Sequence, residues 1–248
     1  MQLAESEWHQ REKAGEMTGK SSQLFLIAGL MCLLPFWAAG CRIAASNEQS
    51  PVAALIAKLL PDQPKVRRQK LLDNLSSPDA DTRREGVLQL GRGEAAGWNA
   101  TPNILSIMAL GDQDAQVRAA AVRVLAHISD GPIVFETARK AAKDDSEMVR
   151  LASIAVLSDS SGEPELKTLL ERLAQDRAGE VRAKAAAALG TYNDRRALRG
   201  LLSALEDAQF AVAYRARQSL NRLTGEDMGY DKQAWQQWLY TNNDLFRQ

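Results

Sequence analysis

The chain has 248 residues, 45% of them hydrophobic and 25% charged, which is enough for one or two ordinary folded domains. Its 31 basic and 31 acidic side chains balance, and no basic stripe stands out, which argues against a nucleic-acid-binding protein. With only two cysteines and two histidines, we expect no His/Cys metal site, no Cys–His catalytic pair and no bound cofactor.

The first predicted element is a secretory signal peptide. Residues 1–16 are polar, and Met17 then opens a short basic start that precedes the uncharged residues 24–39. We expect Met17 to be the true start, residues 1–16 an extension upstream of it, residues 17–40 the signal peptide and residues 41–49 a tether. A transmembrane anchor is the second interpretation, although the run is shorter than the ~20 residues that a spanning helix needs.

The apolar run ends in residues 37–41, WAAGC, which resemble the lipobox of bacterial lipoproteins. In that family the cysteine thiol receives a diacylglyceryl group, and the signal is cut in front of the cysteine. The resemblance implies a bacterial protein that is held on the extracytoplasmic side of a membrane by a lipid on Cys41. The alternative is an ordinary cleavage site that is followed by a cysteine. After either cut only Cys41 remains, so no intramolecular disulfide is expected.

A helix is predicted to begin at Ser50-Pro51, with an apolar stripe that includes Leu55, Ile56 and Leu59. We expect it to cap the first of a series of repeats.

The repeats themselves are marked by a phrase with apolar or small residues at its first, fifth and ninth positions. Its five copies recur at intervals of about 31–35 residues, the period of a stacked solenoid, and start at Thr82, Val117, Val149, Val181 and Val212.

Each phrase has the spacing of one helical face, and a second apolar helix precedes it. Three of these leading helices are predicted to begin with a proline in the first turn, at Pro102, Pro132 and Pro164. An aspartate recurs five residues before the phrase. Such an aspartate can cap the second helix or receive the arginine of a neighbouring unit; the four are Asp112, Asp144, Asp176 and Asp207.

The Val-Arg-x-x-Ala-x-x-x-Leu phrase resembles the second helix of HEAT repeats in their bacterial, PBS-lyase-like form, over residues 64–223. The resemblance implies an all-α, α–α superhelix of about five helical hairpins with capping helices at both ends, over residues 50–240, and a tail over 241–248. It also implies that second helices line the concave side, and that the aspartates form one ladder and the arginines another, at Arg83, Arg118, Arg150 and Arg182. Ser77 replaces the first aspartate, and Ala213 replaces the last arginine.

Residues 91–100 form the largest irregular stretch and contain Trp98. Their glycines do not make a dinucleotide-binding pattern. Trp98 is either an anchor for a partner or a plug that folds back over a gap between helices. At the other end, Asp231 is predicted to cap a last helix whose Trp235, Trp238 and Leu239 cover the final repeat. A calcium loop at Asp227 and Asp231 is the alternative, but it lacks the usual ligand spacing.

The second helices also predict a weak binding surface. Residues two, three and six places after the start of each phrase should face away from the core, which gives an alanine-rich trough. With Trp98, the candidate binding residues are Arg84, Arg123, Leu151, Lys184, Tyr214 and Arg215. Such a trough fits a helix or segment of a partner, but alanines there are equally expected where helices crowd together.

These patterns favour a non-enzymatic adaptor of the bacterial cell envelope that binds protein partners and contacts the membrane through Cys41. The competing hypothesis is an enzyme or accessory factor, because related short repeats occur in bilin lyases, which attach chromophores to proteins. A third hypothesis is a purely structural envelope protein. We expect no catalytic residue, no metal and no nucleic-acid partner.

Overall fold

The structure is a computed structural model that describes residues 51–60 and 65–242. These residues belong to one compact unit, residues 48–248. The predicted extension (1–16), signal peptide (17–40) and tether (41–49), which includes Cys41, lie outside the described residues. So do residues 243–248 of the predicted tail.

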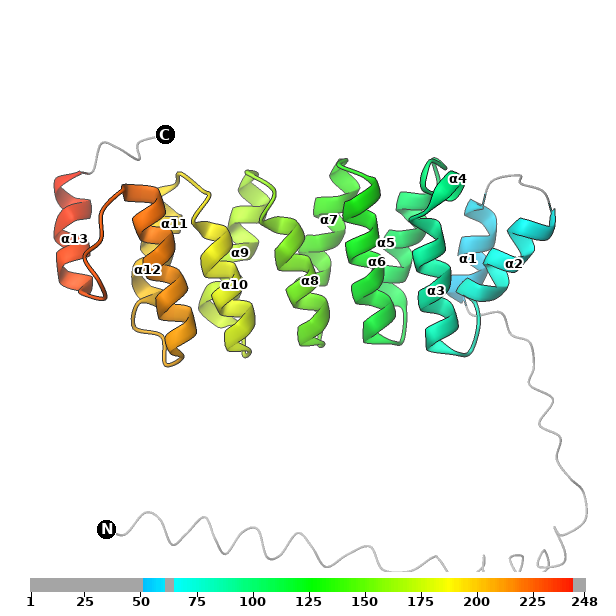
Figure 1. The fold of residues 1–248 in the computed structure, drawn as a ribbon, viewed down its shortest axis with the longest axis horizontal. Coiled ribbons are helices and arrows are strands. Elements are labelled where there is room, and N and C mark those ends of the chain that lie inside the picture. The colour runs from blue at the N-terminus through cyan, green and yellow to red at the C-terminus, as the bar shows by residue number, and fades with distance from the viewer. Residues whose placement is uncertain (1–50, 61–64, 243–248) are drawn as a thin grey trace, which may run out of the picture. The chain divides into compact units, whose positions relative to one another are not determined.

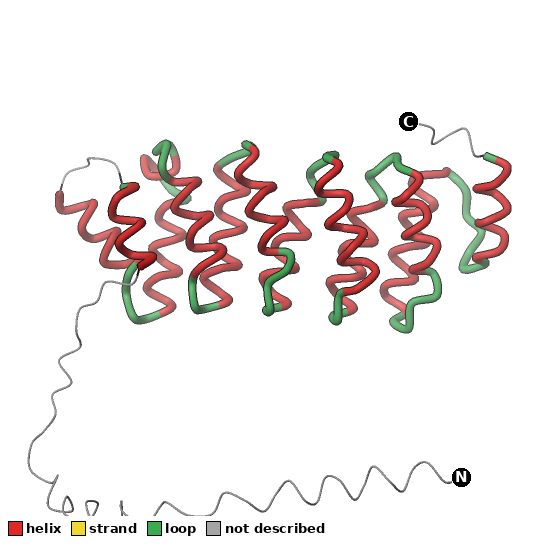
Figure 2. Tube along the Cα trace, turned by 180° about the vertical axis from the view of Figure 1, so that it is seen from behind, coloured by secondary structure: helices red, strands yellow, loops and turns green. Residues whose placement is uncertain are grey.

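The described residues form thirteen α-helices, and most of them lie in two layers (Figure 1). The first layer, which faces the viewer in Figure 2, contains α5 (Thr101–Gly111), α7 (Pro132–Ala141), α9 (Glu163–Gln175) and α11 (Arg195–Ala204). The second layer contains α3 (Ala80–Leu90), α6 (Ala115–Ile128), α8 (Glu147–Leu157), α10 (Gly179–Leu189) and α12 (Phe210–Thr224). Consecutive members of the second layer pack against each other. The predicted all-α solenoid is confirmed.

Five helical hairpins make up the array, as predicted. They are α2 (Lys65–Leu75) with α3, followed by α5–α6, α7–α8, α9–α10 and α11–α12. The repeated phrase places its first, fifth and ninth residues in the core between the layers. In the phrase that starts at Val149, for example, Val149, Ser153 and Leu157 are each fully buried. Truncating such a buried aliphatic side chain to alanine costs roughly 2–5 kcal/mol, so the phrase is first of all a packing signal.

Local sequence explains where the helices begin. Pro102, Pro132 and Pro164 lie in the first turns of α5, α7 and α9, as predicted, where the missing N–H of proline has no helical partner to lose. The helix α11 has no such proline. Instead, the carboxylate of Asp194 accepts a hydrogen bond from the backbone N–H of Arg196 at 2.6 Å.

The two ends of the array carry the expected caps. At one end, α1 (Pro51–Leu59) contacts α2 and also α5. Its Ile56 is buried, but Leu55 is 47% exposed, so the predicted apolar stripe is narrower than expected. At the other end, α13 (Lys232–Thr241) packs against α11. Asp231 caps α13, and Trp235 is fully buried and donates its indole N–H to the carbonyl of Gly229 at 3.1 Å.

One short helix departs from the predicted irregular stretch between the first two repeats. Residues Gly93–Ala96 form α4, which has only four residues and follows Arg92 in an extended conformation. A single turn carries no periodic pattern, because the apolar spacing of a helix becomes visible only over several turns.

Candidate functional site

Four arginine–aspartate pairs join consecutive repeats along the turns between the helices. In each pair Nε and Nη2 of the arginine donate to the two carboxylate oxygens of the aspartate in the next repeat, at 2.7–2.8 Å. This geometry is the strong, two-pronged form of the interaction. The ladder, as we call the set, consists of Arg83–Asp112, Arg118–Asp144, Arg150–Asp176 and Arg182–Asp207.

Each aspartate of the ladder also holds its own turn. One carboxylate oxygen accepts the backbone N–H of the residue two places on, as Asp144 does from Ser146 at 2.8 Å. The predicted contact with the neighbouring arginine is confirmed. The alternative, capping of the second helix by the same aspartate, does not occur, because the N–H that it accepts belongs to the residue immediately before that helix. Ser77 fills the missing first position, because its hydroxyl accepts the N–H of Asp79 at 3.2 Å.

Hydrogen bonds keep the ladder charged in spite of its burial. The central pair is the most buried, with only 4% of the Arg150 side chain and 1% of the Asp176 side chain exposed. Burial by itself would raise the pKa of Asp176, but hydrogen bonds from Arg150 and from the backbone N–H of Ala178 outweigh it and lower that pKa. The hydrogen bond to Asp176 likewise raises the pKa of Arg150. Both groups therefore stay ionised, and their chemistry is structural.

The predicted binding residues of the second helices lie on the solvent-facing side of the second layer, which we call the second-helix face. Arg123, Lys184 and Arg215 are exposed, as is Tyr214 at 40%, whereas Arg84 and Leu151 are half-buried. Tyr214 accepts a hydrogen bond from Gln218 at 2.9 Å, and Arg215 donates to the same amide group at 3.0 Å. On α3, Arg84 donates to Gln116 of α6 at 2.7 Å.

The alanine floor of the predicted trough is mostly closed. Ala119, Ala152 and Ala183 are buried because neighbouring second helices pack directly over them. The crowding interpretation therefore holds at these positions, and the open surface is narrower than predicted. At its centre α8 presents Met148, which is 43% exposed, and the half-buried Leu151.

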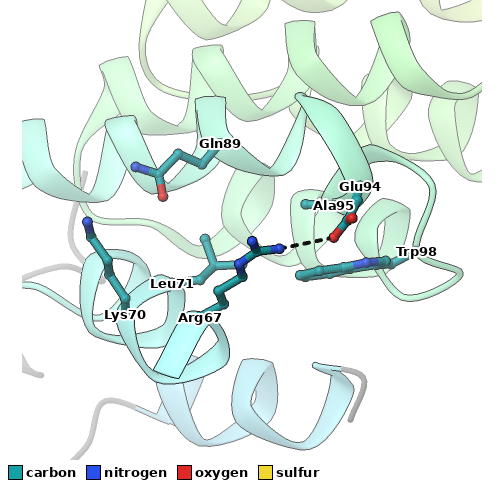
Figure 3. A pocket seen from close by; sticks show the side chains of 7 residues that line it. All are labelled: Arg67, Lys70, Leu71, Gln89, Glu94, Ala95 and Trp98. Atoms are coloured by element: carbon teal, nitrogen blue, oxygen red, sulfur yellow. Dashed lines mark hydrogen bonds and ion pairs between the residues drawn. The ribbon is translucent and has the colours of Figure 1, made fainter. Parts of the chain in front are cut away.

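Trp98 lies apart from these residues and packs as the plug interpretation predicts, while its role as an anchor for a partner stays a prediction. It is half-buried and packs against the core, and it also lines a pocket of about 400 Å³, here called the Trp98 pocket. In Figure 3, Arg67, Lys70 and Leu71 of α2 lie on one side of this space. Glu94, Ala95 and Trp98 lie on the other side. None of the other predicted binding residues lines the Trp98 pocket.

The structure also shows an aromatic cluster that the sequence did not predict. Phe210, 71% exposed, lies between Tyr214 and Tyr230, with ring centroids 6.0 and 5.9 Å away. The guanidinium of Arg217 lies 5.3 Å from the centre of the Tyr230 ring and is held there by Asp227. Hydrogen bonds from Arg217 and from the backbone N–H of Gly229 lower the pKa of Asp227 to about 2. Only Tyr214 carried a sequence signal, because Phe210 and Tyr230 lie outside the repeated positions.

Comparison with known families agrees with this geometry. HEAT repeats match residues 68–158, 101–180 and 166–234, which together cover more than half of the chain. The chain belongs to the HEAT-repeat family. A search among curated proteins found no match. HEAT repeats in general mediate protein–protein interaction, and this HEAT array presents its exposed side chains on a stack of packed helices.

A second, polar pocket of about 210 Å³ lies beside the central pair of the ladder of this HEAT array. Its lining mixes cations, such as Arg172 and Arg177, with the carboxylates of Asp144 and Asp145. Arg172 reaches Asp176 at 3.5 Å, while its buried Nε has no hydrogen-bond partner among the described residues. Because charges of both signs alternate here, the pocket has no clear preference for an anion or a cation.

The described part of the HEAT array offers no group of three or more His, Cys, Asp or Glu side chains that could hold a metal ion. Asp227 and Asp231, the alternative calcium ligands, are engaged by Arg217 and by the backbone N–H groups of α13. His127 is exposed in the last turn of α6. None of the helices among residues 51–60 and 65–242 has the length and apolar character to cross a bilayer.

Proposed function

We propose that this HEAT protein is a non-enzymatic adaptor of the bacterial cell envelope, anchored by a lipid on Cys41, that binds a partner protein on its second-helix face. The proposal that the protein binds a partner rests on the exposed surface of α8. It presents Met148 and Leu151 to solvent between Arg123 of α6 and Lys184 of α10.

An amphipathic helix with an acidic border would fit this surface. Its apolar side chains would cover Met148 and Leu151, and its carboxylates would meet Arg123 and Lys184. The ladder supports such a role, because it fixes the spacing between α6, α8 and α10 through the pairs Arg118–Asp144 and Arg150–Asp176. A surface held in place before binding loses less conformational entropy when the partner docks.

The anchoring part of the proposal depends on residues 17–49. The signal-like run and the WAAGC sequence favour lipidation at Cys41, and several acyl chains together give stable attachment to a bilayer. Residues 42–50 would then link the lipid to α1, which begins at Pro51. Nine extended residues reach at most ~32 Å, so the array would stay close to the membrane surface.

Intact mass spectrometry of the membrane-extracted protein tests the anchor. We expect a chain that begins at Cys41 and carries added acyl groups, and we expect a Cys41→Ser variant to lose them. An unprocessed chain in the membrane fraction would contradict the lipid anchor and favour a spanning one. Co-purification of a tetrapyrrole with a cytosolic chain would instead favour the enzyme hypothesis.

Photo-crosslinking in cells tests the binding face independently of the anchor. A photoreactive residue in place of Arg123 or Leu151 should give a discrete cross-linked band. The same residue in place of Lys167, which is exposed on α9 in the first layer, is the matched control and should give none. Equal bands from both layers, or no band from the second-helix face, would contradict this part of the proposal.

A further inference from the structure

We infer that the Trp98 pocket is a second docking site, which takes an apolar side chain from an acidic, extended segment of a partner protein. The inference rests on the proposed role as a protein-binding scaffold. It does not depend on the lipid anchor or on the second-helix face, because none of the binding residues predicted on that face lines the Trp98 pocket.

The size and lining of the Trp98 pocket fit one apolar side chain with its backbone. The space of about 400 Å³ is open to solvent, so it can receive a side chain without enclosing a whole ligand. Leu71 of α2, together with Ala95 and Trp98 of the insertion between the first two repeats, supplies an apolar lining (Figure 3). An aromatic residue beside a pocket is a frequent source of binding energy at protein interfaces.

The charges around the Trp98 pocket favour an acidic partner. Lys70 has no carboxylate partner among the described residues. Arg67 meets Glu94 through one contact of 3.4 Å, and both side chains are about three-quarters exposed, at 73% and 75%. Exposed pairs of this kind are weak, so a carboxylate of the partner can displace Glu94. Among the residues that line the Trp98 pocket, Arg67 and Lys70 are cations and Glu94 is the one acid.

A hydrogen-bond donor also remains unused. The indole N–H of Trp98 has no acceptor among the described residues, although its backbone N–H donates to the carbonyl of Ala95. An extended peptide offers a row of free carbonyl oxygens, which are the acceptors that such a donor needs. A nucleotide would also offer oxygen acceptors, but it has no aliphatic side chain to fill the space beside Leu71.

Fluorine NMR of the full-length chain in mild detergent tests this site. The protein is labelled with 5-fluorotryptophan, and the resonance missing from a Trp98→Phe variant identifies Trp98. The probes are two blocked pentapeptides with a central leucine, flanked on each side by two glutamates in one and by two lysines in the other. We expect the glutamate peptide to shift the Trp98 resonance saturably and at least five-fold more tightly than the lysine peptide.

Variants separate the contributions to this binding. Lys70→Gln and Arg67→Gln should each weaken the glutamate peptide about three- to ten-fold, and Glu94→Gln should tighten it two- to three-fold. Lys167→Gln, which removes an exposed lysine of α9, should leave it unchanged. Raising the salt concentration should weaken the glutamate peptide, because exposed charges are screened.

An unshifted Trp98 resonance at millimolar peptide, or equal shifts with the lysine peptide, would overturn the inference. So would an equal shift with a single-stranded oligonucleotide, because that result would indicate an unspecific cationic site. If the peptide binds as expected while the photo-crosslinks of the second-helix face are absent, the proposed main interface is wrong and the Trp98 pocket remains. The reverse pattern removes the Trp98 pocket alone.

Discussion

Replacing Arg150 by methionine removes the most buried arginine–aspartate pair of the HEAT array. Arg150 donates two hydrogen bonds to Asp176 at 2.8 Å. It donates two more, at 3.0 Å, to the carbonyls of Asp144 and Asp145. In the variant Asp176 keeps the N–H of Ala178, at 2.9 Å, and the longer contact with Arg172.

The magnitude follows from this burial. Removing one partner of a buried ion pair typically costs ~3–5 kcal/mol of unfolding free energy. The remaining 3.5 Å contact between Arg172 and Asp176 places the expected loss at the lower end of that range. The matched control is Arg182→Met at the last pair, where 15% of the arginine side chain and 13% of the Asp207 side chain are exposed. Water can reach that aspartate, so the loss there should be about 1.5–3 kcal/mol, the value of hydrogen bonds to a charged group.

Urea unfolding followed by circular dichroism measures the loss. The affected pair joins α8 to the turn before α10, so each half of the array should also unfold more independently. The 5-fluorotryptophan resonances of Trp98 and Trp235 report on the two halves, and their unfolding midpoints should separate in Arg150→Met but coincide in the parent.

An Asp176→Asn substitution added to Arg150→Met completes the experiment, because asparagine keeps the turn and removes the charge. The double variant should regain about half of the free energy lost in Arg150→Met, since no unpaired buried charge remains. A loss below about 1 kcal/mol in Arg150→Met would show that the buried pair contributes little to stability. A loss no larger than that of Arg182→Met would contradict the expected effect of burial.

Three further predictions concern pH, packing and capping. Burial would raise the pKa of Asp144, but hydrogen bonds from Arg118 and from the backbone N–H of Ser146 outweigh it and lower that pKa. The ionised Asp144 therefore contributes to stability at pH values above the ordinary pKa of ~3.9. This contribution should disappear as the pH falls through the lowered value, and a urea midpoint that stays constant from pH 5 to pH 2 would contradict this. Gly190→Ala places Cβ 2.6 Å from the Ser219 hydroxyl and should cost ~1–3 kcal/mol in thermal unfolding. Asp231→Ala removes the cap of α13 and should cost ~0.5–2 kcal/mol, with a red shift of tryptophan emission as Trp235 becomes exposed; unchanged emission and stability would show that the cap is dispensable.

The repeated positions made most of the fold predictable. Packing in a solenoid recurs with every repeat, so one rule places Val149, Leu157 and their equivalents in the core. The arginine–aspartate pairs were predictable for the same reason, because a side chain that bridges repeats must recur at the same position in each. Asp231 and Trp235 were predictable as a cap because the last repeat must cover its apolar face.

The features that the sequence missed depend on distances between helices. Whether Ala119 or Ala152 faces solvent depends on how closely α6 and α8 approach, which no spacing along the chain reveals. Likewise, Phe210 and Tyr230 are twenty residues apart and meet only because residues 225–231 fold back beside α12. Tyr214 was identified from its position on the repeat, but its two aromatic neighbours lie outside any repeat.

The residues that are available to bind a partner are therefore those that do not recur from repeat to repeat. At recurring positions, selection for packing and for the ladder leaves small or paired side chains, such as Ala183 and Arg182, that offer little to a partner. The insertion that contains Trp98 recurs in no other repeat, and neither does the exposed α8 surface at Met148. A partner that recognises both would contact two separate places on one stack of packed helices. Linking two weak contacts in this way raises the affinity well above that of either one, provided that the partner can span them.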